Sequence, residues 1–141
     1  MSSALVKINI KNFQNKLSVN PEKIKKLIRY ILRAEKINKS GWINICLVNN
    51  PLIKKFNSKF HHTHSATDVL AFNLSTDKKI IQADIIVSTD MAKKQAKIFK
   101  TTPDYELSLY FVHGVLHILG YDDNNKKQTQ LMRKKESKYV Y

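Results

Sequence analysis

Residues 107–123 read LSLYFVHGVLHILGYDD, and this stretch decides the fold that the sequence predicts. Apolar residues lie on nearly every side of a helix built from residues 107–119. A helix of that kind is surrounded by protein rather than lying on the surface. Thr102 and Pro103 are typical of a helix start, and Gly120 is a natural stop at its end. We therefore expect a buried central helix between these positions.

Two histidines lie four residues apart within this helix. His113 and His117 therefore share one helical face, and the turn after Gly120 can return Asp122 or Asp123 to that face. Two imidazoles and a carboxylate, with the remaining position left to water, form a catalytic site for a zinc-type metal ion. The alternative is two core histidines bonded to the backbone. Desolvating two unpartnered imidazoles is costly, which favours a shared ion.

The residue after the first histidine separates this pattern from that of zinc peptidases. Those enzymes carry a glutamate there as the general base, whereas this chain has Gly114. Classical peptide hydrolysis is therefore not expected. A glycine at this position permits close packing of the helix, or approach of a substrate backbone to the metal, and the sequence leaves both readings open.

Strands and helices alternate along the rest of the chain. Apolar residues recur with period two, or as short runs, over 5–10, 42–48, 69–74 and 80–87, which predicts strands. Capping residues and helical spacing predict helices over 21–36, 50–60, 88–100 and 125–139, with a polar loop over 61–67. The order predicts an α/β domain of the α+β type, with a mixed sheet of about four strands packed by about five helices.

The charge of the chain is strongly positive. It carries 25 Lys+Arg against 11 Asp+Glu, a formal net charge of +14, which favours a polyanionic partner, and nucleic acid first among them. The alternative is a general compositional bias toward lysine.

Apolar segments are shorter than the roughly 20 residues of a membrane span, and the N-terminus lacks a secretory pattern. We expect a cytoplasmic protein.

Residues 113–123 resemble the signature of the YbeY family of bacterial rRNA maturation factors, His-Gly-x-Leu-His-Leu-x-Gly-Tyr-Asp-His. Further resemblance lies upstream. Residues 67–72, TDVLAF, are similar to the family's Thr-Asp-Val-Leu-Ser-Phe, and residues 83–88, ADIIVS, are similar to its Gly-Asp-Ile-Val-Ile-Ser. Gln95-Ala96 and a tail from Met132 to Glu136 also correspond.

The resemblance implies that residues 1–141 form a single YbeY-like metal-dependent hydrolase domain. The implied activity is that of an endoribonuclease specific for single-stranded RNA, with roles in maturing the 3′ end of small-subunit rRNA and in ribosome quality control. Its implied partners are single-stranded RNA, ribosomal RNA and the small ribosomal subunit, with no membrane or DNA role. One zinc-type ion per chain is implied, held by His113, His117 and residue 123.

Two positions depart from the family pattern. Most members have histidine where this chain has Asp123, and aspartate is a competent zinc ligand that shifts metal preference toward harder ions. Asp122, Asn124 or a loop histidine are the alternatives for the third ligand. The family usually has arginine where this chain has His61. We expect His61 to take the catalytic role there, as donor or general acid/base, with Lys59 binding the substrate. The alternative is a solvated polar loop.

Two other functions compete with that of an endoribonuclease. The chain fits a non-catalytic, ribosome-associated RNA-binding protein whose metal is structural, and it also fits another metal-dependent hydrolase acting on small phosphoesters. Metal-dependent turnover separates the first rival from the nuclease, and competition between RNA and generic phosphoesters separates the second.

Overall fold

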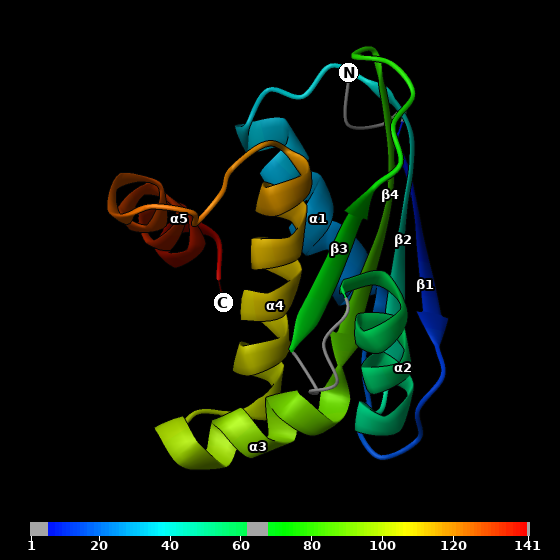
Figure 1. Ribbon diagram of the computed structural model, residues 1–141, viewed down its shortest axis with the longest axis vertical. Helices are drawn as coiled ribbons and strands as arrows, with labels where there is room; N and C mark the ends of the chain where they lie inside the picture. The colour runs from blue at the N-terminus through cyan, green and yellow to red at the C-terminus, as the bar shows by residue number, and fades with distance from the viewer. Residues whose placement is uncertain (1–5, 62–67, 141) are drawn as a thin grey trace.

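The computed structural model of the chain describes residues 6–61 and 68–140, the side chains of residues 58–61 excepted. Strands and helices follow one another in the predicted order, as Figure 1 shows. The elements are β1 (Val6–Asn12), α1 (Pro21–Ala34), β2 (Ser40–Val48), α2 (Asn50–His61), β3 (Val69–Asn73), β4 (Ile80–Ser88), α3 (Thr89–Phe99), α4 (Pro103–Ile118) and α5 (Lys126–Tyr139). The α+β prediction is confirmed. His61, predicted in the loop, is the last residue of α2.

The strands form one mixed sheet in the order β1-β2-β4-β3. β1, β2 and β4 run parallel, and β3 runs antiparallel to β4 at the edge. In the register of the parallel strands Ile10 lies opposite Ile45, and Ile45 lies opposite Ile85. Because side chains alternate between the two faces of a strand, this register gathers the even-numbered apolar residues of β1 and the odd-numbered apolar residues of β2 and β4 on one face of the sheet.

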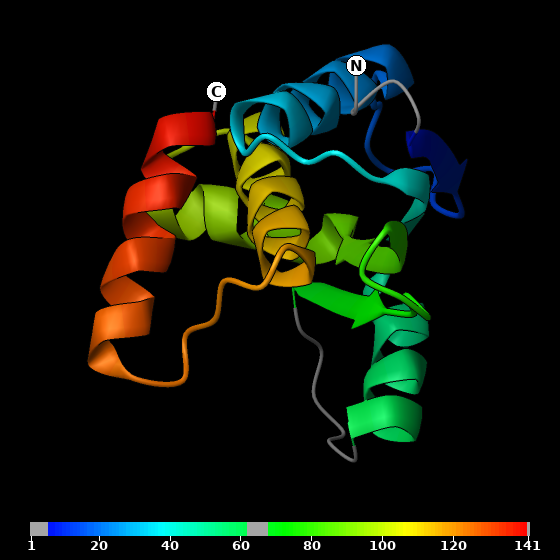
Figure 2. The same cartoon turned by 90° about the horizontal axis from the view of Figure 1, so that it is seen from above.

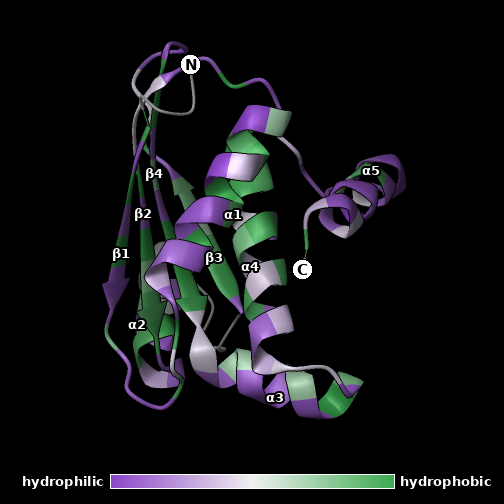
Figure 3. Cartoon of the chain, turned by 180° about the vertical axis from the view of Figure 1, so that it is seen from behind, coloured by the Kyte–Doolittle hydropathy of each residue, from purple (hydrophilic) through white to green (hydrophobic). Residues whose placement is uncertain are grey.

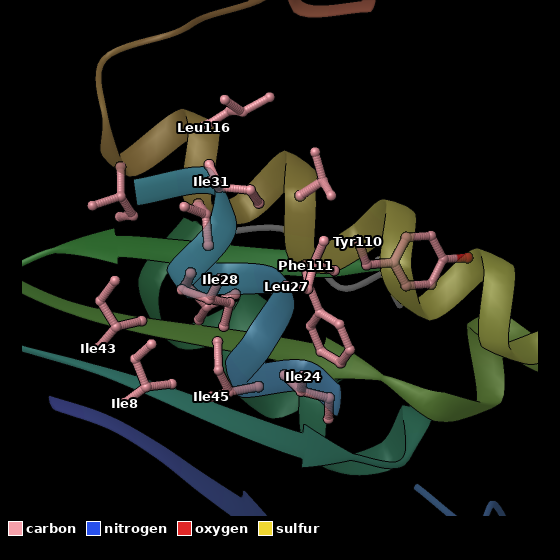
Figure 4. Close-up of a cluster of buried hydrophobic side chains, with 14 of the residues drawn as sticks. Ile8, Ile24, Leu27, Ile28, Ile31, Ile43, Ile45, Tyr110, Phe111 and Leu116 are labelled. Atoms are coloured by element: carbon pink, nitrogen blue, oxygen red, sulfur yellow. The ribbon is translucent and has the colours of Figure 1, made fainter. Parts of the chain in front are cut away.

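Helices α1 and α4 cover that face, and α2 lies against the other, as the view from above shows (Figure 2). The larger apolar cluster lies between the sheet and helices α1 and α4. Figure 4 shows Ile28, Ile45 and Phe111 meeting within it. A smaller cluster lies under α2, around Ile53 and Ile86. The sheet is therefore buried on both faces only where α2 reaches.

Capping side chains set the starts of α1 and α4. The Asn20 side chain accepts hydrogen bonds from the backbone N–H groups of Glu22 and Lys23, with Pro21 at the first position of α1. Thr102 Oγ1 accepts from the backbone N–H of Tyr105 in the same way. These side chains satisfy N–H groups that have no partner within the helix, and both starts agree with the sequence prediction.

Helix α5 stands apart from the sheet beside α4 (Figure 1). Its buried residues are Met132, Glu136 and Tyr139, and most of its surface is hydrophilic, as Figure 3 shows from behind. Within the described residues, every helix is too short or too polar to cross a membrane. The attachment of α5 therefore depends on a few contacts, and one of them, between Glu136 and His113, lies at the predicted histidine site.

Candidate metal centre

Helix α4 carries both histidines and is as buried as the sequence predicts. Phe111, Val112, Val115 and Leu116 are almost fully buried around it. His113 is partly buried, and the side chain of His117, near the end of the helix, is 44% exposed. The apolar residues thus fix the helix against its neighbours, while the histidines remain within reach of solvent.

Gly114 is required for packing of α4 on the sheet. A Cβ atom at this position would lie 2.8 Å from Cγ2 of Ile85 and 3.4 Å from Cγ2 of Val69. A carbon–carbon approach of 2.8 Å is well inside the favourable separation of about 3.5–4.0 Å. Of the two readings that the sequence left open, the structure supports close helix packing. This close approach sets the depth at which the histidine-bearing face lies.

Gly120 ends the helix as predicted. Its φ of 106° lies in the left-handed region that favours glycine. The backbone N–H of Gly120 donates to the carbonyl of His117, and that of Tyr121 donates to the carbonyl of Leu116. This pair of bonds is a Schellman motif, which reverses the chain direction at a helix end. The reversal brings the two acids that follow, Asp122 and Asp123, back beside the end of α4.

His113 is held by a buried carboxylate from α5. Its Nδ1 lies 2.5 Å from Oε2 of Glu136, whose side chain is only 5% exposed. Arg133 Nη1 donates to the other oxygen, Oε1, at 2.7 Å. The hydrogen bond to Glu136 raises the pKa of His113, against the opposing effect of burial. Burial favours a raised pKa for Glu136, but the bonds from His113 and Arg133 outweigh it, and its pKa is lowered.

His117 faces a different acid. Its Nδ1 lies 3.6 Å from Oδ1 of Asp122, and both side chains are well exposed. Each imidazole therefore directs Nδ1 toward a carboxylate, closely for His113 and more loosely for His117. Metal-binding histidines generally have this arrangement, because a carboxylate at one ring nitrogen fixes the tautomer that leaves the other nitrogen as a metal ligand. Nε2 is accordingly the candidate ligand atom in each ring.

A cavity of about 380 Å³ opens beside His113. Asp123 and Glu136 lie in its wall, as does Asp68 at the start of β3. Tyr110 also lines the cavity, and its hydroxyl is buried without a hydrogen-bond partner among the described residues. Burial is the main cause that raises the pKa of this hydroxyl. The cavity therefore combines an imidazole with carboxylates, and the buried Tyr110 hydroxyl belongs to a residue of its wall.

The donor set fits a zinc-type ion in its chemistry, because two imidazoles and carboxylates are available from one helix end and its turn. His113 and Asp123 line the same cavity, whereas His117 does not line it. Among the side chains that the structure describes, which leaves out those of residues 58–61, no three from His, Cys, Asp or Glu lie close enough together to hold an ion. The three-ligand set of His113, His117 and Asp123 stays a prediction.

The predicted catalytic and substrate-binding residues lie at the end of α2. His61 and Lys59 belong to that helix by their backbone, but their side chains lie outside the described residues. Of the other histidines weighed as ligands, His62 and His64 lie in residues 62–67, which the structure does not describe. Their roles stay predictions as well.

Sequence reasoning missed two glutamates that organise this region. Glu136 was noted only as part of a family-like tail, and it lies 23 residues from the histidine that it holds. Glu35, at the end of α1, accepts hydrogen bonds from Tyr121, Tyr139 and Lys135, and so joins α1 to the turn and to α5. Neither contact has a local sequence signal, because each joins elements far apart in the chain.

A family model described as Endoribonuclease YbeY matches residues 9–141 of the chain. The chain belongs to this family. Endoribonuclease YbeY of Carboxydothermus hydrogenoformans is 33% identical over 133 residues, which cover 93% of each chain. Endoribonuclease YbeY of Petrotoga mobilis is 32% identical and covers 87% of this chain and 85% of its own. The resemblance of the histidine segment to the YbeY family is thereby confirmed.

The fold agrees with that of a solved structure. The solution structure of TM1509 from Thermotoga maritima is 30% identical in sequence to this chain. It superposes with a TM-score of 0.68 over 94% of this chain and 85% of that one. The α+β architecture is therefore shared with a solved structure.

Proposed function

We propose that this chain, an endoribonuclease by its family, cleaves single-stranded RNA with the help of one divalent metal ion. The observation that carries the proposal is the pair of histidines on α4, each with Nδ1 facing a carboxylate. The formal net charge of +14 supports a polyanionic substrate.

The residues that would hold the ion are His113, His117 and Asp123. A bound zinc-type ion supplies Lewis-acid polarisation of a phosphodiester oxygen and a water of lowered pKa. Glu136 orients His113 so that Nε2 faces away from the carboxylate. Zinc is the expected ion. The carboxylate of Asp123 would raise the affinity of the site for harder metal ions, relative to zinc, compared with a site that has a third histidine.

The RNA backbone would be held by basic residues near the cavity. Arg133 lines the cavity and keeps a side chain that is 60% exposed, although one of its nitrogens donates to Glu136. Helix α5 adds exposed lysines whose charge attracts phosphates, with Lys135 bound to Glu35 instead. At the end of α2, Lys59 would bind the substrate and His61 would act as donor or general acid/base. The exposed lysines of α5 are Lys126, Lys127, Lys134 and Lys138.

The biological substrate that we propose is ribosomal RNA. The chain would act in the cytoplasm on the 3′ end of small-subunit rRNA and in ribosome quality control, in contact with the small ribosomal subunit. The support for this part is the family resemblance together with the basic charge, because a strongly positive protein associates readily with a phosphate-rich particle.

Cleavage of a labelled, unstructured RNA tests the proposal. Protein stripped of metal by a chelator is compared with the same protein after zinc is added back, and a duplex of the same sequence serves as the second substrate. We expect zinc-dependent cleavage of the single strand only. The Asp104→Asn variant, on the exposed start of α4, serves as a control for handling and should cleave like the wild type.

Other results of this experiment point to the rival functions. Tight RNA binding without zinc-dependent turnover would identify a non-catalytic RNA-binding protein with a structural metal. Faster hydrolysis of a generic phosphoester than of RNA would identify a different hydrolase. Cleavage by the stripped protein would exclude the metal mechanism.

A further inference from the structure

Among the described residues, no helix covers one half of the sheet on the face opposite α1 and α4. On this face α2 packs over the carboxyl ends of the strands, through a cluster that includes Val48, Leu70 and Ile86. Figure 1 shows α2 beside the lower ends of β2 and β4. The amino-terminal half of β2 lies beyond its reach, and Trp42 lies there.

Trp42 is the single tryptophan of the chain. It is only partly buried, and among the described residues it belongs to neither of the two apolar clusters. In the sheet register Trp42 lies between Lys7 on β1 and Gln82 on β4. Beyond Gln82, the backbone N–H of Leu74 donates to the Gln82 carbonyl, and the Leu74 side chain is 47% exposed. A large, partly accessible aromatic side chain therefore lies on this face rather than in a core.

A row of hydrogen-bonded polar side chains adjoins Trp42. Asn9 Nδ2 donates to Asn44 Oδ1 at 2.9 Å, and Asn44 Nδ2 donates to Asp84 Oδ1 at 3.1 Å. These three residues lie opposite one another in register across β1, β2 and β4. The bonds fix the orientation of both amides, while leaving amide and carboxylate groups that can bond to the edges of nucleic-acid bases.

Two lysines border this surface at the sheet edge. Lys7 and Lys11 are exposed, and by strand alternation they lie on the same face as Asn9. Against them, Asp84 is the acid that β1, β2 and β4 place on this face, and it accepts from Asn44. The local charge balance is therefore positive, which complements a phosphate backbone running along β1.

We propose that this uncovered surface, named the Trp42 face and defined by Lys7, Asn9, Lys11, Trp42 and Asn44, is a second binding surface for single-stranded RNA. The inference deepens the proposed function and rests on it for the choice of RNA. A base stacks on the Trp42 ring, Asn9 and Asn44 contact base edges, and the two lysines bind flanking phosphates. Exposed aromatic rings with basic side chains on a sheet bind single strands in this way, largely irrespective of sequence.

Protection of the sheet edge explains the lysines of the Trp42 face but does not explain its tryptophan. Lysines on an edge strand also discourage pairing with another sheet, so Lys7 and Lys11 alone do not indicate a ligand. Edge protection does not explain a tryptophan on an interior strand outside both clusters. Stacking on a base uses the ring, and the lysines beside it then act in binding as well as in protection.

Tryptophan fluorescence tests the inference directly, because Trp42 is the sole tryptophan. The full chain is titrated with a short oligouridylate at low and at moderate salt. We expect saturable quenching that weakens as salt rises. The double variant Lys7→Ala/Lys11→Ala should bind the oligonucleotide about tenfold more weakly than a control that loses the same charge on the exposed side of α3, Lys94→Ala/Lys97→Ala.

A second measurement guards against misfolding and separates the two hypotheses. Trp42→Ala should weaken binding about tenfold by fluorescence anisotropy of labelled RNA, with an unchanged circular dichroism spectrum. The Trp42 face would be overturned if RNA binding were equal in all variants and Trp42 fluorescence were not quenched. Normal zinc-dependent cleavage in the same samples would show that the proposed nuclease function still holds. A face that serves a protein partner would give that same result. Quenching without any cleavage would instead overturn the proposed function alone.

Discussion

Helix α4 has two sides that differ in how they are held. On the side of the sheet and α1, its contacts are apolar, and Gly114 allows a close approach to Ile85 and Val69. On the side of α5, which also contributes Met132 to the larger apolar cluster, a buried polar contact joins His113 and Glu136. The first side is stabilised by apolar area removed from water, and its close packing is sensitive to changes in side-chain shape. The second side is stabilised by specific hydrogen-bond partners, and it is sensitive to changes in their donor and acceptor groups.

This difference separates stability from function within one helix. Substitutions on the sheet side should unfold the chain without addressing the metal directly. Substitutions on the α5 side should change metal binding at a smaller cost in stability. Variants that reverse this division would show that the two sides are not distinct.

The largest expected effect is on the sheet side. Phe111 is 1% exposed and lies in the larger cluster. Phe111→Ala should lower the free energy of unfolding by about 3–5 kcal/mol, because it removes buried contacts and leaves a cavity. Urea denaturation of the metal-free protein measures this. A loss below about 1 kcal/mol would show that the sheet side is loosely packed.

The buried polar contact comes next. Glu136→Gln keeps the shape of the side chain, but its amide NH2 is a donor. It would face another donor, on either His113 or Arg133, where the carboxylate accepted a hydrogen bond. We expect a loss of about 1–3 kcal/mol in the free energy of unfolding. Zinc affinity, measured by competition with a chelating dye, should fall at least about tenfold.

Arg133→Ala is the matched control for this variant. It removes one exposed partner of Glu136 and leaves the contact with His113 in place. Zinc affinity should then stay within about threefold of the wild type. Equal losses in the two variants would mean that Glu136 acts through overall stability rather than by orienting His113.

The third prediction concerns acid sensitivity. Burial favours a raised pKa for Glu35, but hydrogen bonds from Tyr121, Tyr139 and Lys135 outweigh it and lower the pKa from 4.5. A lowered pKa contributes stability that is present above the unfolded-state pKa and is lost as pH falls through the folded-state pKa. Glu35→Gln should therefore be about 1–3 kcal/mol less stable than the wild type at neutral pH. Thermal unfolding across pH should show the difference shrinking in acid; a difference independent of pH would contradict this account.

The smallest effect is expected at the exposed start of α4. Lys23 and Asp104 form an ion pair at 3.0 Å with both side chains well exposed. Asp104→Asn should change the free energy of unfolding by less than about 1 kcal/mol, because water and salt screen such pairs. Chemical denaturation at low and high salt checks this. An effect as large as that of Glu136→Gln would erase the distinction between buried and exposed polar contacts.

Local signals in the sequence predicted the elements and their order. Apolar periodicity located the strands, the Asn20-Pro21 and Thr102-Pro103 pairs located helix starts, and Gly120 located the end of α4. Each of these features acts within a few residues, so a single sequence displays it. The buried central helix followed from the same kind of signal.

The contacts that complete the site could not be predicted in the same way. Glu136 meets His113 across 23 residues, and Glu35 meets Lys135 across 100, so only the folded arrangement brings them together. The sequence also could not decide between packing and substrate access for Gly114, because that choice depends on Ile85 in another element. Long-range polar partners carry no periodicity that would reveal them.

The central claim is that His113, His117 and Asp123 together hold one metal ion. The most direct test is elemental analysis of zinc-saturated and desalted protein for the wild type, His117→Gln, Asp123→Ala and Asp122→Ala. The last variant alters the neighbouring acid, which faces His117 instead of the cavity. We predict about one zinc per chain in the wild type, none in His117→Gln or Asp123→Ala, and a reduced but not abolished zinc content in Asp122→Ala, because Asp122 would only orient His117. Zinc retained by Asp123→Ala but lost from Asp122→Ala would contradict the assignment.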